Sequence, residues 1–312
     1  MKPELVVVGP LLPALMETLD RDYVTHRLWE VPDRDALLAE VGPRVRAIAT
    51  SGHHGATAAL MDALPNLEII GCFGVGVDAI DIGHAKARGV IVTNTPDVLT
   101  DDVADLAVGL LLAVARGIVA GDRHVRSGKW LQGPMPLMRK VSSGLVGIAG
   151  LGRIGRAIAK RVDALGARIA YYGRRSYADV DYPFYGDLVS LARDCDYLIL
   201  ATPGGADTHH MVDRAVIDAL GPAGALINIG RGSLVDEAAL VDALVAGRLG
   251  GAGLDVFEDE PRVPQALFAL DNVVLQPHVG SATVETRQAM GDLVAANLRA
   301  HFAGRPPITP FF

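Results

Sequence analysis

Three ionisable side chains in the second half of the chain follow buried-type apolar segments: Arg231, Glu260 and His278. The predicted strands before them span residues 225–229, 251–256 and 273–276. Because the carboxyl ends of parallel strands meet at one edge of a sheet, these side chains should project from the same rim. A cation, a carboxylate and an imidazole beside a nicotinamide could together reduce a 2-oxo acid. The cation would bind the substrate carboxylate, and the protonated imidazole would donate to the oxygen that gains charge as hydride arrives.

Each of the three residues also fits an ordinary structural position. Arg231 could lie at a helix start on the surface, Glu260 in a solvated turn, and His278 in the core with its hydrogen bonds satisfied. The catalytic interpretation gains from their shared placement at strand ends. It also pairs the histidine with a carboxylate, which stabilises a protonated imidazole and fixes its tautomer.

The segment 144–176 predicts a dinucleotide-binding unit. A strand at Leu145–Ala149 precedes the G-x-G-x-x-G glycines, which are followed by a helix at Arg156–Leu165 and a strand at Arg168–Tyr172. These glycines are Gly150, Gly152 and Gly155. The first makes the tight turn, the second lets backbone approach a pyrophosphate, and the third lets the helix pack on the strand. The helix N-terminus supplies N–H groups for the phosphates. The alternative is a glycine-rich turn in another α/β sheet.

The end of the second strand of this unit indicates which dinucleotide is bound. An NAD-binding unit places an acidic residue there to bind the ribose hydroxyl. This chain has no carboxylate at that place but reads Gly173, Arg174, Arg175 and Ser176. Guanidinium groups bind phosphate through a bidentate fork, so the sequence predicts NADP(H). Asp179 and Asp181 lie too far along the chain to be the usual ribose ligand. The alternative interpretation is that the two arginines are solvated surface residues.

Composition limits the classes of protein to consider. The 312 residues are 50% hydrophobic and 21% charged, with a net charge of −7, as expected for a globular protein with room for two domains. The acidic balance argues against nucleic acid or an anionic membrane as partner. Cys72 and Cys195 are predicted to be reduced core thiols of a cytoplasmic protein. No signal peptide is expected, and the apolar stretch Leu106–Ala115 is too short to span a bilayer.

The alternation of strands and helices predicts an α/β fold with two Rossmann-like or flavodoxin-like, doubly wound parallel-sheet domains and the active site in the cleft between them. Residues 1–95 plus 283–312 are expected to form the substrate-binding domain, and 96–282 the dinucleotide-binding domain. Within the latter, 101–143 is expected to carry dimerisation helices. Its first helix should have its core at Val103–Val119, followed by Ile118–Ser127. The apolar surface of the first helix exceeds what one domain face buries, so we expect a homodimer.

No metal site is predicted. Two pairs of adjacent histidines, His53–His54 and His209–His210, lack the spacing of a helical zinc site, and no cysteine cluster accompanies them. The loop that carries His53 is expected at the same rim as the turn at 73–76, so this histidine could touch substrate.

Several motifs in order resemble one family. They are Phe73–Asp78, Asn94–Asp105, Gly150–Gly155, Asn228–Gly232, Asp255–Pro261 and Gln276–Ser281. With them the chain resembles, over nearly its whole length, the D-isomer-specific 2-hydroxy acid dehydrogenases. Within that family it is most similar to the hydroxyphenylpyruvate, hydroxypyruvate and glyoxylate reductase branch.

The resemblance implies reduction of a small 2-oxo acid to the D-2-hydroxy acid by a homodimer, and the residues Gly173–Ser176 predict NADPH as the reductant. His278 would be the general acid/base, Glu260 its partner, and Arg231 the binder of the substrate carboxylate and carbonyl. The implied substrate-binding residues are Val75, Gly76, Arg231, His278 and Ser281. The implied cofactor-binding residues are Gly150, Leu151, Gly152, Arg153, Ile154, Gly155, Gly173, Arg174, Arg175, Ser176, Thr202, Pro203, Ile229, Arg231, Asp255, His278 and Gly280. Among these, Asp255 and the backbone at Ile229 would orient the nicotinamide amide. The segment Trp130–Met138 would reach the neighbour's active-site mouth.

Related activities of the same fold remain as alternatives. Formate dehydrogenases have glutamine where this chain has Glu260, and phosphoglycerate dehydrogenases usually have an acidic NAD site. Phosphite oxidation uses a similar set of residues and stays open. A dinucleotide-sensing corepressor of this fold is the alternative from a different class of protein. Such proteins usually add tails for partner motifs, whereas this chain ends soon after its last helix, which favours the enzyme.

Overall fold

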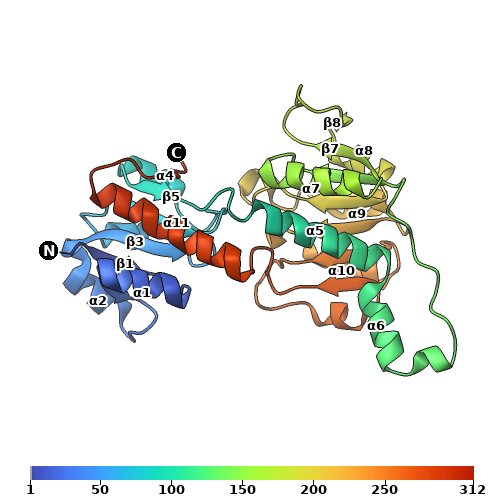
Figure 1. Ribbon diagram of the computed structural model, residues 1–312, viewed down its shortest axis with the longest axis horizontal. Coiled ribbons are helices and arrows are strands. Elements are labelled where there is room, and N and C mark those ends of the chain that lie inside the picture. Colours follow the sequence, from blue (N-terminus) through green and yellow to red (C-terminus); the bar gives the residue numbers. More distant parts are fainter. Residues whose placement is uncertain (1) are drawn as a thin grey trace. The chain divides into compact units, whose positions relative to one another are not determined.

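The computed structural model describes residues 2–312, which form two compact units (Figure 1). The first runs through Leu99 and is completed by Ser281–Phe312, and the second is Thr100–Gly280. Each unit has one parallel sheet with helices packed on it, so the predicted fold class of two α/β parallel-sheet domains is confirmed. The chain passes between the units at positions within four residues of the predicted boundaries.

The first unit has a five-stranded sheet of order β2-β1-β3-β4-β5, parallel throughout. Its strands are β1 (Glu4–Val7), β2 (Val24–Arg27), β3 (Val45–Ser51), β4 (Ile69–Phe73) and β5 (Ile91–Thr93). Its helices are α1 (Pro13–Asp22), α2 (Arg34–Val41), α3 (Ala58–Asp62), α4 (Ile82–Ala87) and α11 (Val284–Phe302). Helix α11 packs on β4 and beside α1, which explains why residues after Ser281 belong to this unit.

The second unit has a seven-stranded parallel sheet of order β12-β11-β10-β9-β6-β7-β8. Its strands are β6 (Leu145–Ala149), β7 (Arg168–Tyr172), β8 (Phe184–Tyr185), β9 (Tyr197–Leu200), β10 (Ala225–Asn228), β11 (Gly251–Leu254) and β12 (Val273–Leu275). Its helices are α5 (Thr100–Ala115), α6 (Ile118–Arg126), α7 (Arg153–Ala164), α8 (Leu188–Asp194), α9 (Arg214–Leu220) and α10 (Glu237–Val245). Helices α5 and α7 pack together on one face, and α9 packs beside α8 and α10 (Figure 1). Since all the strands are parallel, the loops after them lie at one edge.

Short polar side chains start most of these helices. Asp33, Thr57, Asp81, Asp187 and Asp236 each accept a hydrogen bond from a backbone N–H in the first turn. Such caps satisfy donors that have no partner inside the helix. They explain why these helices begin directly after the capping residue.

Two parts of the second unit differ from the prediction. The helix predicted to continue to Val119 ends at Ala115, because Gly117 has φ 59° in the left-handed region and starts a separate helix bent by 57°. Strand β8 has only two residues and was not predicted. Within residues 2–312, no single helix has the length and hydropathy of a membrane span, although α5 and α6 taken together pass by length and composition only.

Cys72 and Cys195 are both buried, as predicted. Burial raises the pKa of the Cys195 thiol to about 12, so this thiol stays protonated at neutral pH. By contrast, the segment that follows α6 exposes apolar side chains: Trp130 is 67% exposed, Leu131 95% and Leu137 100%.

Candidate active site

The glycine turn after β6 has the geometry of a phosphate-binding turn. Gly150 has φ 97°, and a Cβ there would lie 2.7 Å from Thr202 Oγ1. A Cβ on Gly152 would meet nothing within 4 Å, which leaves open space over this backbone. A Cβ on Gly155 would lie 2.0 Å from the Gly150 carbonyl oxygen, so only glycine lets the helix approach the turn. Helix α7 begins at Arg153, three residues earlier than predicted, and its first N–H groups therefore lie beside the open turn.

The segment after β7 carries the predicted 2′-phosphate ligands. Gly173 is half-buried, and Arg174, Arg175 and Ser176 are exposed. The Tyr177 N–H donates a 2.8 Å hydrogen bond to the buried Tyr171 hydroxyl, which fixes the far end of this segment.

Asp179, set aside above as a ribose ligand, instead binds an arginine of helix α7. Arg156 Nη1 and Nη2 lie 2.9 and 3.1 Å from its two carboxylate oxygens. The hydrogen bond from Arg156 holds the pKa of Asp179 below its usual value. The guanidinium groups of Arg156 and Arg175 also lie over the Tyr177 ring, 4.9 and 5.6 Å from its centroid. The segment is therefore attached to α7 in this structure.

His278 and Glu260 form a hydrogen-bonded pair. His278 Nδ1 lies 2.7 Å from Glu260 Oε2, although the residues belong to loops after different strands. The other oxygen of Glu260 accepts a 3.1 Å bond from the Phe257 N–H, which orients the carboxylate. The His278 side chain is 46% exposed and that of Glu260 21%, so the imidazole is open to solvent while its partner is sheltered. Within the described residues no hydrogen bond engages Nε2 of His278, which leaves this nitrogen for another molecule.

The turn that carries His278 is built around Asp255. His278 has φ 53°, in the left-handed region that non-glycine residues rarely adopt, and its N–H donates to the Asp255 carbonyl at 2.8 Å. The Asp255 carboxylate accepts bonds from the N–H groups of Val279 and Gly280, at 2.7 and 2.8 Å. Burial raises the pKa of Asp255, and these two bonds oppose that rise. Sequence reasoning considered Asp255 only as a nicotinamide contact and missed its support of the histidine turn.

Arg231 follows β10, the neighbour of β11 in the sheet, so it lies at the same edge as Glu260 and His278. It is half-buried, and its Nη1 donates to the Gly230 carbonyl at 2.7 Å. The backbone carbonyl of Arg231 accepts a 2.9 Å bond from the Asn228 side chain, which closes the turn. A Cβ on Gly230 would lie 2.8 Å from the Thr202 carbonyl oxygen, so this turn packs against the loop after β9.

The remaining predicted substrate residues, Val75, Gly76 and Ser281, belong to the first unit. The Val75 carbonyl accepts from the Asn94 side chain at 2.9 Å, and the Gly76 carbonyl lies 3.6 Å from Cys72 Sγ. These contacts fix the turn after β4 from inside its own unit.

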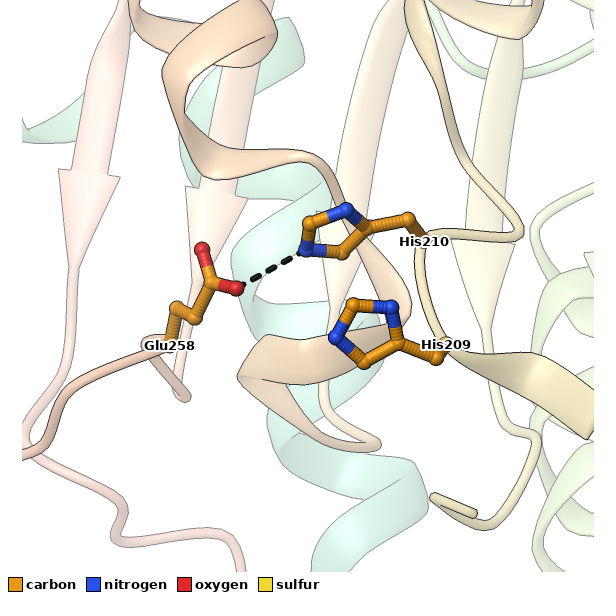
Figure 2. A group of neighbouring side chains, drawn as sticks. All are labelled: His209, His210 and Glu258. Atoms are coloured by element: carbon orange, nitrogen blue, oxygen red, sulfur yellow. Dashed lines mark hydrogen bonds and ion pairs between the residues drawn. The ribbon is translucent and has the colours of Figure 1, made fainter. Parts of the chain in front are cut away.

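A second group of ionisable side chains lies in the dinucleotide unit: His209 and His210 after β9, and Glu258 after β11 (Figure 2). His210 Nε2 lies 2.8 Å from Glu258 Oε1, and the two imidazole rings are stacked with centroids 3.9 Å apart. The histidine pair is evident in the sequence, but its contact with Glu258 is not. His210 and Glu258 are 48 positions apart in the sequence, so no local pattern signals that contact.

Comparison with known proteins shows the family to which the chain belongs. A sequence profile described as "D-isomer specific 2-hydroxyacid dehydrogenase, NAD binding domain" matches residues 108–280. A glyoxylate/hydroxypyruvate reductase A of Arabidopsis thaliana is 53% identical over 98% of this chain and 97% of its own length. The chain belongs to the D-isomer specific 2-hydroxyacid dehydrogenase family. This dehydrogenase is also 52% identical, with the same coverage, to a hydroxyphenylpyruvate reductase of Plectranthus scutellarioides.

Solved structures agree with the family. An NADPH-dependent glyoxylate/hydroxypyruvate reductase from Sinorhizobium meliloti, in complex with NADP and malonate, matches with a TM-score of 0.93 at 47% identity. The match covers 99% of this dehydrogenase and 97% of that chain. A 2-hydroxyacid dehydrogenase from Ketogulonicigenium vulgare matches with a TM-score of 0.94 at 50% identity, over 100% and 99% of the two chains. The predicted family and the class of oxidoreductase are thereby confirmed, as is a nicotinamide dinucleotide cofactor.

Proposed function

We propose that this dehydrogenase reduces a small 2-oxo acid, such as glyoxylate or hydroxypyruvate, to the D-2-hydroxy acid with NADPH. His278 is the proton donor in this proposal. The observation that carries it is the His278–Glu260 pair, because Glu260 takes Nδ1 and leaves Nε2 as the outer nitrogen. A proton donor needs this arrangement: one ring nitrogen is fixed by a carboxylate and the other can reach substrate.

The steps assigned to the chain's own residues follow from their chemistry. NADPH, when bound, supplies the hydride to the carbonyl carbon. The Arg231 guanidinium binds the substrate carboxylate through its planar fork of N–H donors and polarises the carbonyl. His278 Nε2 donates its proton to the carbonyl oxygen as negative charge develops there. The C=O bond thus becomes CH–OH, and the Glu260 carboxylate stabilises the imidazolium before transfer. Val75, Gly76 and Ser281 are proposed as further substrate contacts.

The preference for NADPH rests on the segment after β7. Gly173 provides no carboxylate that would repel a 2′-phosphate, and three exposed donors follow it. A charge-assisted hydrogen bond contributes about 1.5–3 kcal/mol. One retained contact would therefore give roughly tenfold or greater preference for NADPH. The Sinorhizobium meliloti reductase, described as NADPH-dependent, supports this proposal.

The experiment that tests the proposal measures kcat/KM for NADPH and NADH with glyoxylate and with hydroxypyruvate. We expect NADPH to be preferred and the preference to shrink with added salt, which screens exposed arginines. The double variant Gly173→Asp, Arg174→Ala should reverse the preference, because it adds repulsion and removes attraction. Equal or better use of NADH by the wild-type enzyme at low and moderate ionic strength would show that the arginines do not bind the cofactor.

We also propose a homodimer that uses the segment 101–143. The exposed side chains Trp130, Leu131 and Leu137 in this segment support the proposal, because large exposed apolar side chains are buried when subunits associate. Light scattering at micromolar concentration should give twice the mass of the chain. A monomeric mass would refute the dimer without affecting the proposed reaction.

A further inference from the structure

We infer a binding site for a divalent transition-metal ion at His209, His210 and Glu258, separate from the proposed chemistry. Each residue offers one ligand atom, and these atoms lie within 4.8 Å of one another. Two of them, His210 Nε2 and Glu258 Oε1, are already 2.8 Å apart. In Figure 2 both imidazole rings present a nitrogen toward the side on which the Glu258 carboxylate lies.

The backbone explains how two adjacent histidines come to share a side. Consecutive residues of an extended chain point in opposite directions. His209 is extended, with φ −60° and ψ 125°, but His210 has φ 50° in the left-handed region. This conformation accompanies the stacking of the rings, whose planes differ by 27°. The His210 N–H donates to the Ser233 carbonyl at 2.8 Å, and Thr208 Oγ1 donates to the Pro203 carbonyl at 2.9 Å, so the loop is fixed on both sides of His209.

The backbone at Glu258 is also held in place by a hydrogen bond. The Glu258 N–H donates to Glu237 Oε2 at 3.1 Å, which joins the loop after β11 to the start of α10. Burial raises the pKa of Glu237, and the negative charges of Glu258 and Asp259 raise it further. Asp259 is paired with Arg262, whereas Glu258 faces the histidines. A cation at the histidines would therefore enter a region of negative potential.

The donor set indicates the class of ion. Imidazole nitrogens suit Zn²⁺, Co²⁺ or Ni²⁺, whereas Mg²⁺ and Ca²⁺ prefer oxygen ligands only. Two imidazoles and one carboxylate leave coordination positions for water. Bond lengths near 2.1 Å place tetrahedral ligands roughly 3.4 Å apart, so ligand atoms separated by 4.8 Å would have to approach by about 1.4 Å. His209 is exposed, so its ring can make this movement by shifting its stacking on His210.

The test is a titration of untagged protein, stripped with chelator, with Zn²⁺ and separately with Co²⁺, followed by calorimetry and thermal unfolding. No substrate or cofactor is present, so the result is independent of the proposed reaction. We expect about one equivalent of Zn²⁺ to bind and to raise the Tm, because an ion that binds the folded state stabilises it. The single variants His209→Ala and Glu258→Gln should each weaken binding at least tenfold, and Glu237→Gln should weaken it by roughly 10-fold as a supporting group.

The matched control is the other adjacent pair, in the variant His53→Ala, His54→Ala. Those rings lie edge to face at 84°, and His54 Nδ1 is 2.9 Å from Ser51 Oγ. This variant should bind Zn²⁺ as the wild type does. Loss of binding in the control, or binding unchanged in Glu258→Gln, would overturn the site. Both single variants replace exposed side chains, and their far-ultraviolet circular dichroism and Tm without metal report whether they fold.

Discussion

Glu258 and Glu260 lie two residues apart, and each binds a histidine from a different loop. The distances are alike, 2.8 Å to His210 and 2.7 Å to His278, and both histidines have left-handed backbone, with φ 50° and 53°. The difference is the ring nitrogen that the carboxylate binds. Glu260 binds Nδ1 of His278, the inner ring nitrogen, whereas Glu258 binds Nε2 of His210, the outer one. A glutamate–histidine pair thus leaves the outer ring nitrogen accessible in the loop after β12, whereas the carboxylate occupies that nitrogen in the loop after β9.

The two pairs also differ in how the surrounding chain fixes them. Under His278, the buried carboxylate of Asp255 accepts two backbone N–H groups of the histidine's own turn. Under Glu258, Glu237 accepts one N–H, and it holds the glutamate rather than the histidine. A proton donor must keep its position relative to the substrate to a fraction of an ångström. The stronger support lies where the chemistry is proposed.

The largest expected effect comes from removing the imidazole of His278, the proposed proton donor. His278→Ala should lower kcat by ~10²–10⁴-fold, the usual contribution of a positioned proton donor. NADPH binding, followed by fluorescence, should be nearly intact. The corresponding His210→Ala should lower kcat far less, because Glu258 already engages its outer nitrogen. A His278→Ala enzyme with wild-type turnover would remove the assignment.

Next in size is the charge of the partner carboxylate. Glu260→Gln keeps the shape but loses the negative charge that favours the protonated imidazole. We expect kcat to fall by about tenfold or more. Glu258→Gln should leave kcat nearly unchanged. If the two variants lower kcat equally, the distinction between the pairs is wrong.

A smaller effect should follow from weakening the turn under His278. In Asp255→Asn one carboxylate oxygen is replaced by an amide that cannot accept the N–H of Val279 or Gly280. Leaving a buried donor unpaired costs about 1–3 kcal/mol, which urea unfolding would measure. Because His278 is held by the same turn, kcat should fall together with stability. A variant that unfolds with the wild-type midpoint would show that the two bonds contribute nothing.

The smallest effect concerns Glu237, whose pKa is raised mainly by burial. Between the ordinary carboxyl pKa and the raised value, the folded state binds more protons than the unfolded state, so the free energy of unfolding falls as pH rises. The Glu237→Gln variant has no carboxyl group at this position, so its free energy of unfolding does not fall with pH for this reason. Relative to wild type, the variant should gain stability as pH rises from about 4 to neutrality. Urea unfolding at several pH values tests this, and a constant difference between the proteins would contradict it.

Much of the fold could be predicted because its signals are local. Leu145–Ala149 and Arg168–Tyr172 were predicted to the residue, since short apolar runs and flanking turn residues define them. The end of α5 could not be predicted from apolarity alone, because the apolar pattern continues past Gly117 and only its left-handed φ shows the break. Strand β8 is too short for any periodic pattern.

The candidate site could likewise be predicted only in part from the sequence. Motif spacing predicted that Arg231, Glu260 and His278 follow neighbouring strands, and the topology of the sheet agrees. Which nitrogen a carboxylate binds depends on side-chain geometry that spacing does not encode. The same holds for Asp255, which supports the turn through backbone groups of residues 24 and 25 positions away.

The backbone on both sides of the segment Gly173–Ser176 is held by hydrogen bonds. At one end the Gly150 N–H donates to the Tyr172 carbonyl at 2.9 Å, and at the other the Tyr177 N–H is bound by Tyr171. A segment of four residues with fixed ends loses little conformational entropy when a nucleotide binds. Its side chains can therefore be substituted together, because the hydrogen bonds at either end keep the path of the backbone.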